Sequence, residues 1–218
     1  MIPDKIKIFA DGADLESILE LNKNPLIKGF TTNPTLMKKA GVVNYKAFAK
    51  EVIKNINDKP LSFEVFADEI NEMEKQANEI ASWGDNVNVK IPITNTKNES
   101  TIDLISNLSK KGISCNVTAI FTTKQVLDLM NKIDLNSNII VSVFAGRIAD
   151  TGIDPSPLML ECANIMKNHK NAELLWASPR EILNIFQAAM CGCHIISHCN
   201  NMPATHHSLK YILYFSST

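Results

Sequence analysis

Short runs rich in β-branched residues recur along this chain, separated by stretches with the spacing of amphipathic helices. Such alternation is typical of repeated βα units, in which crossover helices join parallel strands. We predict strands at residues 6–10, 27–31, 61–66, 87–92, 113–118, 139–144, 173–177 and 194–198. We predict helices near residues 13–22, 44–56, 68–83, 99–110, 122–131, 157–168 and 179–190, with Asp14, Asn44, Thr101, Thr122 and Ser178 as N-caps.

Eight βα units in about 200 residues predict a compact (β/α)8 barrel, an α/β fold of the TIM type. No linker rich in Pro, Gly or Ser divides the chain, so we expect a single domain over residues 1–218. A doubly wound open sheet is the alternative topology. The first predicted strand is not followed by G-x-G-x-x-G, which argues against a dinucleotide-binding version of that sheet.

The charge balance limits the kind of partner. The chain has 22 Lys and Arg against 23 Asp and Glu, a net charge of -1, and no polybasic stretch for nucleic acid or an anionic membrane. No apolar run approaches the length of a membrane span, and residues 1–5 lack the features of a signal peptide. We therefore expect a cytoplasmic protein with a small-molecule partner, and neither nucleic acid nor a membrane as partner.

Seven side chains that can bind metals lie close together near the end of the sequence. Zinc sites usually combine two separated pairs of ligands. His194 and His198 have a suitable spacing, but Cys191 and Cys193 are only two positions apart and no distant second pair exists. We predict no metal site, although a zinc-binding segment stays open as an alternative. The seven residues are Cys191, Cys193, His194, His198, Cys199, His206 and His207.

Lys90 is the first candidate for a reactive group. Apolar residues at 87, 89, 91 and 93 alternate with polar residues at 88, 90 and 94, so Lys90 faces away from the packed side of its strand. In an enclosed cavity, desolvation favours the neutral amine that forms a Schiff base with a ketone or aldehyde. A solvated lysine at a strand edge is the alternative that this segment alone leaves open.

Polar side chains stand at the ends of most predicted strands. In a (β/α)8 barrel the carboxyl ends of the strands meet at one face, where the loops build the active site. One such residue would more often be a turn or a cap, but the repeated pattern favours a common site. The residues are Asp11, Thr31, Thr32, Asn33, Glu64, Lys90, Asn116, Thr118, Ser142, Phe144 (aromatic, beside Ser142) and Ser178.

Four ordered motifs carry a resemblance to a known family. They are Thr-Thr-Asn-Pro within Gly29–Met37, Val-Lys-Ile-Pro at Val89–Pro92, Ser-Val-Phe-Ala-Gly-Arg at Ser142–Arg147 and Ala-Ser-Pro-Arg at Ala177–Arg180. With these motifs, the chain from Lys5 to about Ile196 resembles the transaldolase family, in particular its short single-domain branch, which also includes the fructose-6-phosphate aldolases.

The resemblance implies a role for each matching residue. Lys90 forms an imine with a ketose phosphate, and Asp11 removes the proton of the C4 hydroxyl. Glu64 and Thr118 share a water and move protons during imine formation. The implied substrate-binding residues are Asn33, Asn116 and Ser142 for hydroxyl groups, Arg147 and Arg180 for the phosphate, and Thr32, Phe144 and Ser178 around them. No metal or organic cofactor is implied, because the lysine provides the electrophile.

Two residues bear on the type of reaction. Transaldolases of this family have glutamate in strand 3 and phenylalanine in strand 6, whereas the aldolases have glutamine and tyrosine. Glu64 and Phe144 therefore favour a transaldolase of the pentose phosphate pathway. Such an enzyme moves dihydroxyacetone from sedoheptulose 7-phosphate to glyceraldehyde 3-phosphate, giving erythrose 4-phosphate and fructose 6-phosphate. A fructose-6-phosphate aldolase and a non-catalytic barrel acting as a binding protein are the alternatives.

The resemblance ends with the last predicted strand. From about residue 199 the chain has an atypical tail in place of the family's long helical C-terminal region. In the short branch that region helps to hold subunits in pentamers or decamers. The resemblance thus implies a homo-oligomer, and the altered tail leaves the number of subunits open.

Overall fold

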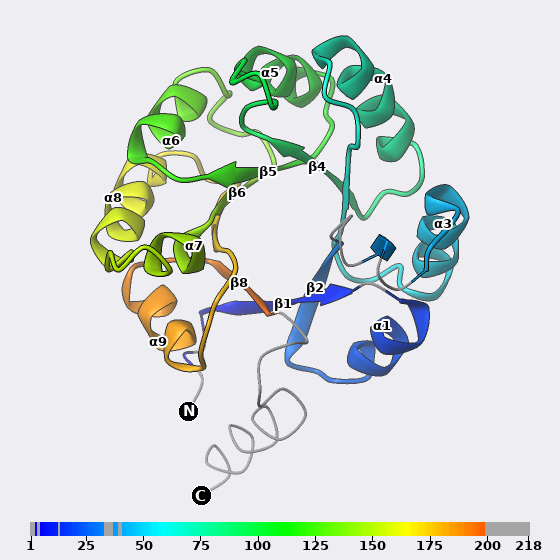
Figure 1. The fold of residues 1–218 in the computed structure, drawn as a ribbon, viewed down its shortest axis with the longest axis horizontal. Helices are drawn as coiled ribbons and strands as arrows, with labels where there is room; N and C mark the ends of the chain where they lie inside the picture. The colour runs from blue at the N-terminus through cyan, green and yellow to red at the C-terminus, as the bar shows by residue number, and fades with distance from the viewer. Residues whose placement is uncertain (1–2, 4, 13, 33–36, 39–40, 199–218) are drawn as a thin grey trace, which may run out of the picture.

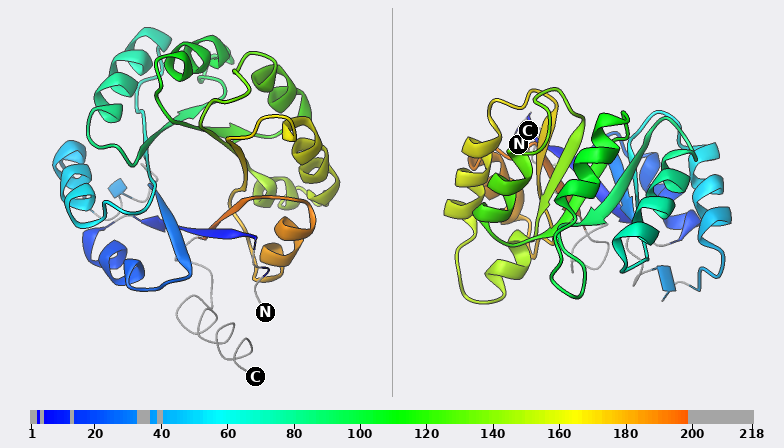
Figure 2. Two further views of the ribbon diagram at one scale, coloured as in Figure 1. Left: turned by 180° about the vertical axis from the view of Figure 1, so that it is seen from behind. Right: turned by 90° about the horizontal axis from the view of Figure 1, so that it is seen from above.

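The protein is a closed barrel of parallel strands. The computed structural model describes residue 3 and residues 5–12, 14–32, 37–38 and 41–198. Within these ranges the strands pair in chain order from β1 to β8, and β8 pairs with β1 to close the barrel. Figure 1 looks down the barrel with the helices arranged around it, and Figure 2 shows the helices outside the strands in a side view. The predicted (β/α)8 fold is confirmed, and the open sheet is wrong.

The observed elements follow the predicted order. The strands are β1 (Lys7–Gly12), β2 (Ile27–Thr32), β3 (Leu61–Glu64), β4 (Val87–Pro92), β5 (Cys115–Ile120), β6 (Ile139–Val143), β7 (Ala172–Trp176) and β8 (Ile195–His198). The helices in the described ranges are α1 (Leu15–Asn22), α3 (Tyr45–Asn55), α4 (Ile70–Ala81), α5 (Ile102–Lys110), α6 (Thr123–Met130), α7 (Ala145–Ala149), α8 (Ser156–Met166) and α9 (Leu183–Met190). None of these helices is both long and apolar enough to cross a membrane.

Three of the predicted N-caps are confirmed. The side chains of Asp14 and Asn44 accept hydrogen bonds from backbone amides of the first turns of α1 and α3. Thr122 caps α6 in a complete capping box with Gln125. These caps satisfy amides that have no partner inside the helix.

The other two predictions hold in part or fail. Thr101 does occupy the N-cap position of α5, but its hydroxyl donates to the carbonyl oxygen of Pro92 at 2.5 Å and makes no hydrogen bond to the helix. Ser178 is wrong as a cap, because α9 begins at Leu183 and its N-cap position is Ile182. Ser178 lies in a left-handed conformation, with φ of 57°, before the loop that leads to α9. The amides of Arg180 and Glu181 in that loop donate hydrogen bonds to the side-chain oxygen of Asn184 in α9, at 2.7 and 3.1 Å.

The barrel interior has an apolar floor. Phe9, Ile140, Leu175 and Ile195 are buried together there, apart from the larger core between the strands and the helices. The ring of Phe9 occupies the space beside Gly29, where an added Cβ would lie 2.6 Å from the ring. Glycine at this point of β2 therefore makes room for a large side chain inside the barrel.

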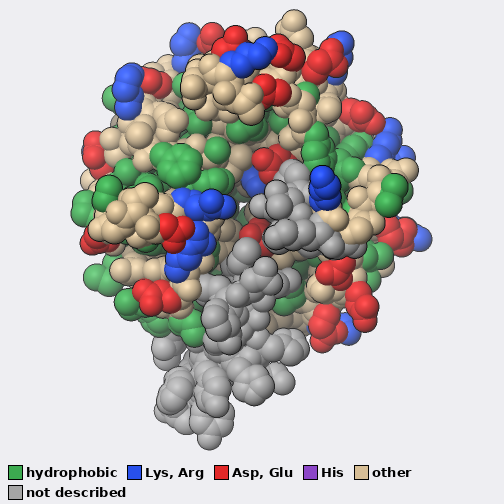
Figure 3. All heavy atoms as spheres, viewed as in Figure 1, with side chains coloured by type: hydrophobic (Ala, Val, Ile, Leu, Met, Phe, Trp, Pro, Cys, Tyr) green, Lys and Arg blue, Asp and Glu red, His purple; other side chains and the backbone are tan. Residues whose placement is uncertain are grey.

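The short helix α7 was not predicted. It follows β6 directly and packs against the segment after β7, where the amide of Gly146 donates to the carbonyl oxygen of Ala177 at 3.2 Å. A Cβ at residue 146 would lie 1.6 Å from the carbonyl oxygen of Ser178. The approach of these two backbones thus requires glycine. Viewed as in Figure 1, α7 lies beside the central hollow of the molecule (Figure 3).

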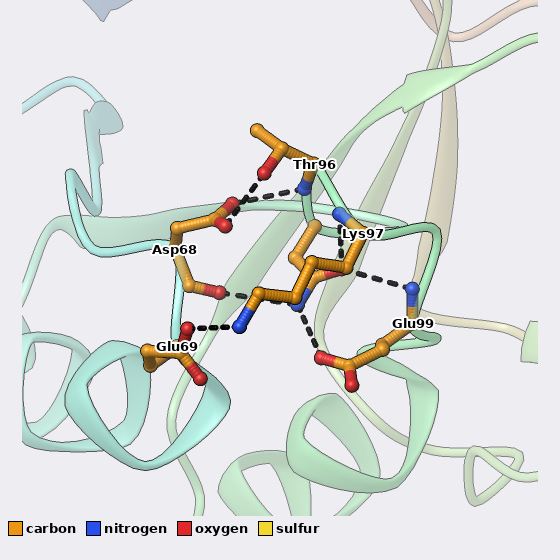
Figure 4. Close-up of polar contacts among 6 residues, drawn as sticks. Asp68, Glu69, Thr96, Lys97 and Glu99 are labelled. Carbon is orange, nitrogen blue, oxygen red and sulfur yellow. Dashed lines mark hydrogen bonds and ion pairs between the residues drawn. The ribbon is translucent and has the colours of Figure 1, made fainter.

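The loops after β3 and β4 are tied together by polar contacts (Figure 4). The carboxylate of Asp68 accepts hydrogen bonds from the amide of Thr96 at 2.9 Å and from its hydroxyl at 2.6 Å. Lys97 forms an ion pair with Glu69 beside this contact. The side-chain oxygen of Asn95 accepts hydrogen bonds from the backbone amides of Lys97 and Glu99. These contacts hold residues 95–99 in a loop, which explains why α5 begins at Ile102 and not near residue 99.

We predict that Gly146→Ala strongly destabilises the protein. The added methyl group meets a backbone carbonyl that cannot rotate away, so the expected loss in unfolding free energy is about 3 kcal/mol. Gly112→Ala is the control, because its Cβ meets nothing within 4 Å and only the positive φ of 80° opposes it. That change should cost about 1 kcal/mol. Equal losses in denaturant unfolding of the two variants would contradict the packing argument.

We also predict a pH-dependent contribution from the contact between Asp68 and Thr96. The hydrogen bonds from the side chain and amide of Thr96 lower the pKa of Asp68 below its ordinary value. A lowered pKa means that the contribution is present above the ordinary carboxyl pKa and is lost as the pH falls through the lowered value.

Asp68→Asn should therefore have a lower unfolding midpoint than the parent protein at pH 7, and the difference should shrink in acid below about pH 4. Asp128→Asn removes an exposed ion pair with Lys124 on α6 and should change the midpoint little. A difference for Asp68→Asn that persists unchanged into acid would show that the carboxylate charge does not stabilise the loops.

Candidate active site

The side chains that form the candidate site come from one face of each strand. In parallel strands alternate residues face the barrel interior, and the register places Asp11 beside Thr31, Glu64 beside Lys90, and Lys90 beside Asn116. These positions lie toward the carboxyl ends of the strands, on the interior side opposite the packed residues of β4. The side chain of Lys90 thus lies on the strand face that the sequence predicted, opposite the packed residues of β4.

Among the described residues, Lys90 has two polar partners inside the barrel. Its Nζ lies 3.0 Å from Oε2 of Glu64, and the two side chains are only 12% and 19% exposed. The same nitrogen donates a hydrogen bond to the carbonyl oxygen of Thr32 at 3.2 Å. The amine is therefore enclosed, held at a defined place and next to a carboxylate that can accept its proton.

Three strands contribute to a buried chain of hydrogen bonds beside Lys90. Ser142 donates from its hydroxyl to Oδ1 of Asn116 at 2.6 Å, and Nδ2 of Asn116 donates to Oγ of Ser62 at 3.0 Å. These two hydrogen bonds fix the orientation of the Asn116 side-chain amide, since its oxygen accepts one and its nitrogen donates the other. The nearby Thr118 hydroxyl is buried and has no hydrogen-bond partner among the described residues. A buried hydroxyl of this kind is suited to a water or a ligand.

A cavity lies above this layer. About 50 Å³ of it is open to a water-sized molecule. The hydroxyl of Thr31 donates to Oδ1 of Asp11 at its wall. Glu64 reaches the site through its ion pair with Lys90. The lining residues are Asp11, Thr31, Lys90, Asn116, Thr118, Ser142, Phe144, Leu175, Ala177, Ser178 and Ser197.

Thr32 does not line this cavity, although we predicted it as a substrate-binding residue. It follows Thr31, so its side chain lies on the opposite face of β2, where its hydroxyl donates to the carbonyl oxygen of Ser62 at 3.0 Å. Its contribution to the site is its own carbonyl oxygen, which holds Lys90. Asn33 lies outside the described residues.

The two predicted phosphate-binding arginines stand outside the cavity. Arg180 binds Asp150 through two hydrogen bonds of 2.8 and 2.5 Å, and the hydrogen bond with Arg180 lowers the pKa of Asp150 below its ordinary value. Arg147 is exposed on α7 and adds to this lowering. Figure 3 shows Lys and Arg side chains together with acidic ones over α7, beside the central hollow.

Two serine residues of the site were not predicted. Ser62 and Ser197 face the interior, Ser62 on the strand face of Glu64 and Ser197 on that of the floor residue Ile195. Thr31 belonged to the predicted set without a role of its own, and it faces the cavity beside Asp11. The signal for both serines was positional, because each lies two residues from another inward-facing side chain. A small hydroxyl residue in a strand is too common for its chemistry alone to identify it.

Two residues at the cavity have unusual backbone conformations. Ala119, which follows Thr118, has a φ of 58°, and Ser178 has a φ of 57°. The register between β5 and β6 shifts at this point, between Val117 and Ile120. Non-glycine residues with positive φ are costly and cluster at functional sites. The two conformations turn the chain at the place where Thr118 and Ser178 face the cavity.

The aromatic wall of the cavity is supported from outside. Phe144 packs against Phe121 in an edge-to-face contact, with 5.4 Å between the ring centroids. Phe121 is 43% exposed, so it lies at the rim and not in the cavity. Such pairs favour a fixed orientation of the partly buried Phe144 ring.

The proposed zinc segment is only partly described. His194 accepts a hydrogen bond from the amide of Leu174 at 3.0 Å through Nδ1, and Cys191 and Cys193 are buried. Burial raises the pKa of Cys193, so this thiol stays protonated. No group of three or more metal-capable side chains comes together in the described ranges. The side chain of His198 and residues Cys199, His206 and His207 lie outside them.

Comparison with known proteins agrees with this arrangement. The family model for transaldolase/fructose-6-phosphate aldolase matches residues 8–202. A probable transaldolase of Streptococcus agalactiae serotype V is 37% identical over 191 residues, which cover 87% of this chain and 84% of the relative. A probable transaldolase of Dehalococcoides mccartyi is 36% identical over 191 residues, covering 87% of this chain and 85% of the relative.

A solved structure supports the fold. Dihydrodipicolinate synthase from Rhodopseudomonas palustris superposes with a TM-score of 0.60 at 13% identity, over 88% of this chain and 69% of that one. At this identity the likeness concerns the barrel alone. The family match and the curated relatives, both over most of the chain, go further: the chain belongs to the transaldolase/fructose-6-phosphate aldolase family.

Proposed function

We propose that this protein is a Schiff-base transaldolase that transfers a dihydroxyacetone unit between sugar phosphates. The observation that carries the proposal is the enclosed amine of Lys90, held 3.0 Å from the Glu64 carboxylate within a layer of polar side chains. Family membership supports the same chemistry. The donors are sedoheptulose 7-phosphate or fructose 6-phosphate, and the acceptors are glyceraldehyde 3-phosphate or erythrose 4-phosphate.

The first half of the reaction forms the imine. The amine of Lys90 gives up its proton to Glu64 and attacks C2 of the ketose. The carbinolamine then loses water, with Glu64 and the Thr118 hydroxyl moving the protons through a shared water. The buried hydroxyl of Thr118 supports this role, because no described residue forms a hydrogen bond with it and such a water can.

The second half breaks and remakes a carbon bond. Asp11 removes the proton of the C4 hydroxyl, the C3–C4 bond breaks, and its electron pair moves to the imine to give an enamine. The aldose phosphate leaves. The enamine carbon then attacks the aldehyde of the acceptor, Asp11 returns the proton, and hydrolysis of the imine releases the new ketose.

The neighbouring polar groups fit the substrate hydroxyls and phosphate. Asn116 and Ser142 already form a hydrogen-bonded chain at the cavity wall, which suits them to bind the dihydroxyacetone unit. Arg180 presents its guanidinium to a carboxylate, Asp150, and a phosphate can replace that carboxylate with the same two-point geometry. Arg147 lies three positions before Asp150 and adds positive charge there.

The proposal requires no metal or organic cofactor, and its setting would be the pentose phosphate pathway of the cytoplasm. Glu64 and Phe144 favour the transaldolase over the fructose-6-phosphate aldolase, because a phenylalanine at the cavity wall has no hydroxyl to protonate the three-carbon enamine. We keep the homo-oligomeric state as part of the proposal.

Borohydride reduction in the presence of fructose 6-phosphate tests the imine. We predict a three-carbon adduct on the peptide that contains Lys90, found by intact mass and peptide mapping. Lys90→Met should keep the fold and lose roughly a thousandfold or more in turnover, because methionine has a similar volume but no amine. Lys124→Met, on the exposed surface of α6, is the control. Turnover that survives Lys90→Met would exclude the mechanism.

Phe144→Tyr tests the type of reaction. The new hydroxyl faces the cavity and can protonate the enamine, so we predict release of free dihydroxyacetone from fructose 6-phosphate without an acceptor, increased about tenfold or more. Phe121→Tyr puts a hydroxyl at the exposed rim and should leave this release unchanged. In the parent protein, product that forms without erythrose 4-phosphate would favour the aldolase instead.

A further inference from the structure

An aromatic cluster behind β2 and β3 contains one hydroxyl group. Tyr45, the first residue of α3, packs edge-to-face against Phe63, Phe66 and Trp83, with ring centroids 6.1, 4.7 and 5.5 Å away. Phe63 and Trp83 also pack against each other at 5.8 Å. The ring of Tyr45 therefore has a packing role that phenylalanine would fill equally well.

The hydroxyl of Tyr45 has a different set of neighbours. It donates a hydrogen bond to the carbonyl oxygen of Glu64 at 3.1 Å and lies beside the Thr32 hydroxyl, whose own proton goes to the carbonyl oxygen of Ser62. Burial raises the pKa of Tyr45 above its ordinary value, although the contacts with Thr32 and Glu64 oppose the increase through their hydrogen-bonding groups. The phenol is therefore protonated at neutral pH and donates to the Glu64 carbonyl.

These two neighbours are the residues that hold the amine of Lys90. The Glu64 carboxylate lies 3.0 Å from Nζ, and the Thr32 carbonyl oxygen accepts its hydrogen bond at 3.2 Å. Thr32 is on β2 and Glu64 on β3, so one phenol spans the two strand ends that supply both partners. Between the described parts of these two strands, Phe30 pairs with Leu61 and Thr31 with Ser62, and beyond them Thr32 and Glu64 pair with β1 and β4 instead of with each other. Side-chain contacts therefore join the end of β2 directly to that of β3.

We propose that Tyr45 is a positioning residue for Lys90. It does not line the cavity. Its hydroxyl fixes the ends of β2 and β3 relative to each other, and through them the Thr32 carbonyl and the Glu64 carboxylate around the amine. The effect of Tyr45 on imine formation rests on the proposed function. Its effect on the position of the Lys90 amine does not.

The experiment compares Tyr45→Phe with Trp83→Phe. Tyr45→Phe keeps the ring and removes the hydroxyl, whereas Trp83→Phe disturbs the same cluster and leaves the hydroxyl in place. The indole nitrogen of Trp83 has no hydrogen-bond partner in the described part of the chain, so its loss removes no polar contact there. Two quantities are measured: the rate of imine trapping by borohydride at increasing fructose 6-phosphate, and the labelling rate of Lys90 by acetic anhydride without substrate.

The expected result for Tyr45→Phe is a maximal trapping rate roughly three- to tenfold lower, with the half-saturating fructose 6-phosphate concentration within about twofold of the parent value. Its Lys90 should also be labelled several times faster, because its partners hold it less firmly. Trp83→Phe should behave like the parent protein in both assays, whatever its melting temperature.

The two proposals fail in different ways. If the parent protein traps no imine, the proposed function fails, and faster labelling of Lys90 in Tyr45→Phe still supports the positioning. If Tyr45→Phe labels and traps like the parent, or if Trp83→Phe shows the same changes, the positioning by the hydroxyl is excluded.

Discussion

The ion pair between Lys90 and Glu64 is the constraint on which the rest of the barrel interior depends. Removing two charges from water costs several kcal/mol for each ion, and the attraction between them offsets this only when other hydrogen bonds are satisfied. Here the Thr32 carbonyl gives the amine a second partner, and Asn116 beside it has its own partners in Ser62 and Ser142. The polar layer is thus what allows a lysine inside the barrel.

The barrel separates that layer from the apolar floor by simple geometry. Each strand presents alternate residues to the interior, so Phe9 and Asp11, or Ile140 and Ser142, stand at successive heights on the same strand face. Closed pairing of β1 with β8 leaves no strand edge and holds these heights in register around the barrel. The amine of Lys90 therefore has packed side chains below it and the loops above it.

Features that depend on alternation within one strand could be predicted from the sequence. Features that depend on contacts between distant segments could not. The eight strands and the inward direction of Lys90 follow from local periodicity. The helix α7 has only the residues Ala145–Ala149, and its place depends on Gly146 meeting the Ser178 carbonyl, a contact that no local pattern reveals. Motif resemblance grouped Thr32 with the site, yet strand parity turns its side chain away. The contact of Tyr45 with Glu64 joins residues 19 positions apart and has no signature in either segment.

Contacts between distant segments also determine how an enamine would be kept from water in the proposed reaction. Little of the cavity is open to water, and Phe144 closes one wall with a ring that can neither donate nor accept a proton. Its orientation depends on Phe121, which directly follows β5 and lies two residues after the left-handed Ala119. The strained turn thus serves two purposes, since it places Thr118 in the cavity lining and Phe121 against the aromatic wall. An intermediate that must wait for a second substrate needs both a proton relay and shelter, and here one turn supports both.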